Sequence, residues 1–122
     1  MRKLLALLVV LAGCHPVQDY SVVDSAVDLF HQRLASSEDD TIYRDAGVDF
    51  QRSIDLETNR KFLGQIRRRR GMPGRATRTS FDIQGAVVTA KYQTSFANGD
   101  ATETFVWRLQ DGKATLLGFT ID

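Results

Sequence analysis

The spacing of the apolar residues changes once along this chain, close to Pro73. Before that point, apolar side chains recur at steps of three and four residues, as from Val23 to Leu34, which is the spacing of one helix face. After it they alternate with polar residues, most regularly from 88 to 96, as in strands that bury one side. The change predicts an α+β domain over residues 21–122, with helices first and an antiparallel sheet after them.

Three helices are expected in the first half. The first is amphipathic and about 15 residues long, and the second is short. Residues 48–54 are left as an irregular link before the third. The expected starts are the capping box Ser21–Asp24, the segment 37–40, and either Asp55 or Thr58. The expected stops are Gly47, Gly71 and Pro73.

Four strands in a meander are expected in the second half. Gly85 breaks the first run, and the pairs Asn98–Gly99 and Asp111–Gly112 are strong signals for tight hairpins. One face of the sheet is expected to receive the helices. The other face is rich in Thr, Gln, Lys and Arg and is expected to meet water.

The first 13 residues have the pattern of a signal peptide, with Arg2 and Lys3 before nine apolar residues. That stretch is too short to span a bilayer, which takes about 20 residues. The run Leu11-Ala12-Gly13-Cys14 resembles the bacterial lipobox. The resemblance implies that Cys14 is lipidated, with palmitate among its chains, and becomes the first mature residue. A plain secretory signal that happens to end in cysteine is the alternative.

A lipidated Cys14 would hold the domain at the cell envelope through a tether, residues 14–20. Three acyl chains make such anchoring effectively permanent, because each buried methylene contributes about 0.8 kcal/mol. In lipoproteins that this leader resembles, an aspartate after the cysteine often retains the protein at the inner membrane. His15 stands there instead, which favours the outer membrane, facing the periplasm, in a Gram-negative cell.

Composition excludes several kinds of function. Without residues 1–13 the chain has 14 basic and 15 acidic side chains, so no nucleic-acid partner is expected. Cys14 is the single cysteine, which leaves no thiol for a disulfide, metal site or nucleophile. The two histidines have no metal-ligand spacing, and Gly-rich phosphate loops are absent. No metal, cofactor or catalytic triad is expected.

The order of elements and the closing segment, Trp107 to Gly112 followed by 116–121, resemble the nuclear-transport-factor-2-like, or cystatin-like, cone fold. Small bacterial lipoproteins of unknown function share this pattern. The resemblance implies a curved, cone-like sheet around a pocket, and domains that often dimerise sheet to sheet. It also implies a strand between the second and third helices, which residues 48–54 would have to supply unless the sheet is smaller.

Glu103, Tyr92 and Trp107 are the candidate pocket residues. Glu103 shares a strand face with Phe105 and Trp107, so it is expected on the core side, where a carboxylate needs a partner or a raised pKa. The alternative is a carboxylate near the hairpin end that pairs with Arg or Lys across the strand. His31 is expected to be a surface or boundary residue.

An arginine run forms the most conspicuous charged feature. It is a candidate contact for an anionic surface, either lipid head groups or phosphate-rich envelope glycans. The favoured alternative is a solvated helix end, where cations complement the helix dipole. The residues concerned are Arg67, Arg68, Arg69, Arg70 and Arg75.

The leading hypothesis is a membrane-anchored, non-enzymatic envelope lipoprotein. It would bind an envelope protein, a glycan or a small apolar ligand, or would serve in assembly. One alternative is a small cone-fold enzyme that uses a pocket acid such as Glu103. Another is a structural domain that associates with itself, as a homodimer.

Overall fold

The computed structural model describes residues 20–122. The predicted signal peptide, Cys14 and the tether up to residue 19 lie outside the described residues and stay predictions. Between residues 20 and 122, no helix has both the length and the apolar character needed to cross a membrane.

Four helices precede the sheet: α1 Ser21–Ala35, α2 Asp39–Asp45, α3 Val48–Ser53 and α4 Leu56–Arg70. Asp55 caps α4, because its side chain accepts a hydrogen bond from the backbone N–H of Thr58. Gly71 ends α4 with a φ of 79°, a conformation that favours glycine. Helix α1 begins one position earlier than a cap at Ser21 predicts, since it already includes Ser21 and Tyr20 takes the N-cap position.

The four predicted strands are confirmed as an open antiparallel meander in the order β1-β2-β3-β4. Their bounds are β1 Pro73–Gln84, β2 Val87–Phe96, β3 Gly99–Gln110 and β4 Lys113–Ile121. The hairpin at Asp111–Gly112 has φ of 52° and 72°, as a tight primed turn requires. The β2–β3 turn lies one residue earlier than expected, at 97–98, because Gly99 already pairs with Phe96.

The irregular link expected over residues 48–54 is wrong, because residues 48–53 form α3. The Gly47 N–H donates to the Leu116 carbonyl of β4 at 2.8 Å. The Tyr43 hydroxyl donates to the carbonyls of Gln51 and Ile54, both at 3.0 Å. These bonds fold the segment back between α2 and β4, so the strand implied by the family resemblance does not form there.

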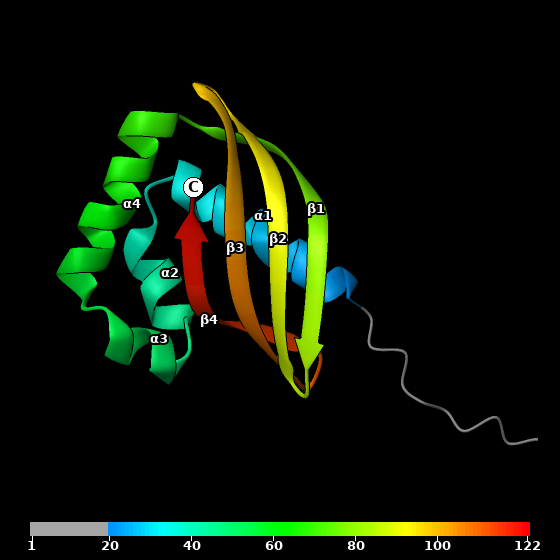
Figure 1. Cartoon of the computed structure of the whole chain (residues 1–122). Helices are drawn as coiled ribbons and strands as arrows, with labels where there is room; N and C mark the ends of the chain where they lie inside the picture. The colour runs from blue at the N-terminus through cyan, green and yellow to red at the C-terminus, as the bar shows by residue number, and fades with distance from the viewer. Residues whose placement is uncertain (1–19) are drawn as a thin grey trace, which may run out of the picture.

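The helices cover one side of a curved sheet (Figure 1). Helix α1 crosses the sheet, and α2, α3 and α4 gather beside β4. The core lies between α1 and the inner faces of β2 and β3, where Val23, Leu34 and Phe105 are almost completely buried. The opposite face of β2 exposes Lys91 and Gln93, so the expected polar outer face is confirmed.

Candidate functional site

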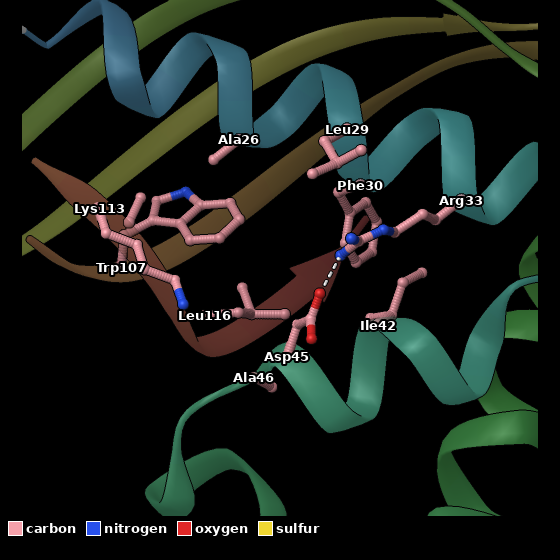
Figure 2. Close-up of a pocket in the computed structure, with 11 residues that line it drawn as sticks. Ala26, Leu29, Phe30, Arg33, Ile42, Asp45, Ala46, Trp107, Lys113 and Leu116 are labelled. Carbon is pink, nitrogen blue, oxygen red and sulfur yellow. Dashed lines mark ion pairs between the residues drawn. The ribbon is translucent and has the colours of Figure 1, made fainter.

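An apolar pocket lies where α1, α2 and the β3–β4 hairpin meet (Figure 2). Its volume is about 120 Å³. Helix α1 contributes Ala26 and Leu29, and the strands contribute Trp107 and Leu116. Leu29 is 44% exposed and places an apolar surface at the pocket's mouth.

Charged side chains border this pocket at two places. At one end, the Arg33 guanidinium lies 2.9 Å from the Asp45 carboxylate and joins α1 to α2. Figure 2 shows this ion pair, with Lys113 on the opposite side of the pocket. The arrangement is an apolar centre with a polar rim, as at the anchor points of protein interfaces.

Trp107 forms the strand wall of the pocket. Its ring stacks on the ring of Phe105, with 5.7 Å between ring centres and 11° between planes, and this contact sets the orientation of the indole. The indole Nε1 atom is buried and has no hydrogen-bond partner among the described residues. The pocket wall is therefore aromatic and is backed by Phe105.

Glu103 lies in a second, fully buried cluster. Its Oε1 atom is 2.7 Å from Nε2 of His31 on α1 and accepts a hydrogen bond from the hydroxyl of Thr94 on β2. Its Oε2 atom has no partner among the described residues. The expected core-side position is thus confirmed, whereas His31, at 7% exposed, is buried and not a surface residue.

Tyr92 belongs to a third group of side chains, at the start of α1. Its hydroxyl donates to Asp24 at 2.6 Å, and Arg78 donates to the same carboxylate at 3.0 and 3.1 Å. Burial, followed by the bond to Asp24, raises the pKa of Tyr92 well above its usual range. Tyr92 is therefore a neutral hydrogen-bond donor and not a base.

The arginine run divides into two kinds of residue. Arg67 donates to both carboxylate oxygens of Asp39 at 2.6 and 2.7 Å and to the Leu34 carbonyl at 3.1 Å. The bond to Asp39 raises the pKa of Arg67. Arg67 therefore holds α4 to α2, while Arg68, Arg69 and Arg75 are exposed and make no ion pair within residues 20–122.

The three candidate pocket residues share the inner face of β2 and β3 but do not form one site. Tyr92 stands directly opposite Glu103 in the sheet, yet only Trp107 of the three lines the apolar pocket. Sequence reasoning missed His31, Leu29 and the Arg33–Asp45 pair. His31 follows Val27 by four residues and precedes Leu34 by three, and this spacing places it on the buried face of α1, so its burial could have been predicted.

No group of three or more His, Cys, Asp or Glu side chains is placed to hold a metal ion between residues 20 and 122. Comparison with protein-family models and with curated proteins found no match to the chain.

Proposed function

We propose that this chain is a lipid-anchored envelope protein whose domain binds a partner protein without catalysis. The partner would insert one apolar side chain into the pocket between Leu29, Trp107 and Leu116. The observation that carries this proposal is the combination of a small volume, an apolar lining and a charged rim at one exposed place.

The volume of the pocket favours a single side chain as its occupant. Pockets for drug-sized ligands usually measure about 300–1,000 Å³, and an apolar cavity of about 150 Å³ is filled by benzene. At about 120 Å³, this pocket accommodates a group the size of a leucine or phenylalanine side chain. Buried apolar anchors of that kind supply much of the binding energy in protein interfaces.

The membrane anchor in this proposal rests on the residues before the domain. A charged start, a short apolar run and the single cysteine at Cys14 form a lipobox-like leader. The tether between Cys14 and α1 would keep the pocket near the membrane surface, since six residues extend over about 20 Å at most. We place the protein at the outer membrane, facing the periplasm, if the cell is Gram-negative.

The fold in this proposal is a variant of the nuclear-transport-factor-2-like cone. A curved meander sheet with α1 across its inner face supports this assignment (Figure 1). The variant would carry α3 in place of the strand that the family resemblance implies.

The enzyme alternative receives less support from the geometry. Glu103 has no exposed surface, and its Oε1 atom is already bonded to His31 and Thr94. A substrate could reach this carboxylate only if α1 moved away from the sheet. The cluster is better explained as a buried polar contact between α1 and the sheet.

The proposal can be tested through the fluorescence of Trp107, which is the single tryptophan of the chain. The purified full chain is titrated with N-acetyl-leucine amide and N-acetyl-phenylalanine amide as side-chain probes. We expect a saturable change in emission with a roughly millimolar Kd, because a dozen atoms at about 0.3 kcal/mol each give weak binding. N-acetyl-aspartate amide should produce no change.

The matched variants are Ala26→Leu, which fills the pocket from α1, and Ala86→Leu, which makes the same change in an exposed turn. Ala26→Leu should weaken probe binding by about tenfold or more, while Ala86→Leu should bind like the wild type. Equal binding by both variants would refute the pocket as the site. Tighter binding of decanoate than of the amides would show that the occupant is a free apolar ligand, which contradicts a side-chain anchor.

A further inference from the structure

Strand β1 is an end strand of the sheet (Figure 1). One of its edges pairs with β2, and its other edge meets no strand of residues 20–122. The opposite end strand, β4, differs because Gly47 donates to it at Leu116 and α3 packs beside it. A row of unpaired N–H and C=O groups along β1 is a template for another strand.

The register of β1 shifts at two places, between Pro73 and Ala76 and between Arg78 and Ser80, and the second shift is a β-bulge that changes which of the following residues share a face. Thr79 is the extra residue, because Arg78 pairs with Tyr92 while Ser80 pairs with the next residue along, Lys91. In a regular strand, residues an odd number of positions apart lie on opposite faces. Across this bulge they lie on the same face.

The register with β2 shows this directly. Ala76 and Phe81 stand opposite Thr94 and Ala90, which are both buried on the inner face. Thr77 and Ser80 stand opposite Gln93 and Lys91, which are both exposed on the outer face. The two residues of each pair, Ala76 with Phe81 and Thr77 with Ser80, lie at equal distances along the strand from the point between residues 78 and 79.

This symmetry makes β1 complementary to itself. When two copies of β1 run antiparallel with their two-fold axis between residues 78 and 79, inner residues meet inner residues and outer residues meet outer residues. A one-residue change of register would break that match. The opposing pairs are Thr77 with Ser80 and Ala76 with Phe81. The next pair outward is Arg75, which has no partner in the β2 register, with Asp82.

The charges agree with this register. Arg75 and Asp82 are both exposed, and neither makes an ion pair within residues 20–122. In the antiparallel pairing each Arg75 would stand opposite the Asp82 of the other copy, giving two cross-strand ion pairs. Opposite charges in facing positions stabilise a sheet, and like charges destabilise it.

We propose that β1 is a homodimer interface, at which two copies of this chain join their sheets edge to edge through residues 75–82. Its occupant is therefore a second copy of the chain. The contact differs from the sheet-to-sheet dimer implied by the family resemblance, whose interface would have to bury exposed Lys91 and Gln93. It also leaves the apolar pocket free, since that pocket lies beside β4.

The first test is a charge swap, read by sedimentation of the full chain in detergent. Arg75→Asp and Asp82→Arg, each alone, should raise the dimer Kd by about tenfold or more, because two attractive pairs become repulsive. The double variant should restore the Kd to about that of the wild type. Arg68→Asp makes the same charge change on α4 and should leave the Kd unaltered.

A wild-type chain that stays monomeric at high concentration would overturn the proposal. Single variants that dimerise like the wild type, or a double variant that does not recover, would overturn it as well. Each variant should unfold at the same temperature as the wild type, which would show that a changed dimer Kd is not caused by misfolding. Arg75 and Asp82 make no ion pair within residues 20–122, so neither substitution removes one from the folded monomer.

A second test uses disulfide formation between copies. Directly opposite Cα atoms in antiparallel strands are about 4.5–5.5 Å apart, which suits a disulfide. A full chain carrying Thr77→Cys, mixed with one carrying Ser80→Cys, should form the mixed disulfide on mild oxidation. Replacing the first variant by Ser95→Cys, an exposed outer-face position on β2, should abolish it. Equal yields from the two mixtures would contradict the register.

Discussion

His31 and Glu103 join α1 to β3 in the interior of the domain. The Nε2 atom of His31 lies 2.7 Å from Oε1 of Glu103, and the glutamate has no exposed surface. The Thr94 hydroxyl on β2 also donates to Oε1, so one buried oxygen of Glu103 is shared by side chains from α1 and β2. The pair is thus a polar contact that sets the position of α1 on the sheet.

Removal of His31 should destabilise the domain strongly. His31→Ala removes one of the two hydrogen bonds to the buried Glu103 side chain and leaves Thr94 as its partner, and a buried polar group that loses a partner typically costs about 1–3 kcal/mol. Adding Glu103→Gln in that background should recover part of the loss, because the amide can donate as well as accept hydrogen bonds at this buried position. Urea unfolding measures both changes. A loss below about 1 kcal/mol in His31→Ala would contradict the role assigned to the pair.

Replacing Arg67 should lower the free energy of unfolding, whereas replacing its neighbour Arg68 should not. Arg67→Ala leaves the Asp39 carboxylate without its donor and leaves the Leu34 carbonyl with only the Ser37 N–H, and should lower the free energy of unfolding by about 2–3 kcal/mol. Arg68→Ala, at an exposed position of the same helix, should change it by less than about 0.5 kcal/mol. Arg67→Lys should restore little, since an ammonium cannot bridge both carboxylate oxygens. Equal effects of the two alanine variants would refute this assignment.

The cap of α4 should make stability depend on acid pH. The backbone bond from Thr58 holds the pKa of Asp55 below its ordinary value of 3.8. The contribution of Asp55 is therefore complete above pH 3.8 and is lost as the pH falls through the lowered pKa. Asp55→Asn caps without titrating in this range. The stability of the wild type relative to this variant should be constant above pH 3.8 and should fall as the pH drops below that value, as chemical unfolding would show. A constant difference would mean that the cap does not titrate as described.

Lipidation of Cys14 should determine where the protein is found. In cells supplied with labelled palmitate, the wild-type chain should carry the label and sediment with the envelope. Cys14→Ser removes the acceptor thiol and should abolish both the label and the membrane association. If the serine variant were processed and fractionated like the wild type, the leader would be an ordinary secretory signal.

The secondary structure of this chain could largely be predicted from local signals. Alternating residues from Val88 to Phe96 and the Asp111–Gly112 turn define strands and hairpins without tertiary information. Helix α3 could not be predicted in this way. Its six residues have no long apolar period, and it is fixed by bonds to distant groups, such as that from Gly47 to Leu116.

The candidate site was less predictable, because it depends on contacts between elements. The alternating pattern placed Trp107 and Glu103 on the inner face of β3. It could not show that α2 completes a pocket beside Trp107, or that His31 contacts Glu103 in the interior. The role of Arg67 likewise depends on a contact between two helices. Four consecutive arginines are equivalent in sequence, and only the approach of Asp39 singles out the first.

The most direct test of the central claim is to locate a bound side-chain probe by NMR. In a solution of the full chain with N-acetyl-leucine amide, the leucine methyl groups should give intermolecular nuclear Overhauser effects to the Trp107 ring and to Leu116. Ala26→Leu should remove these signals. Contacts to exposed apolar residues elsewhere, such as Met72 or Ile83, with none to Trp107, would contradict the account.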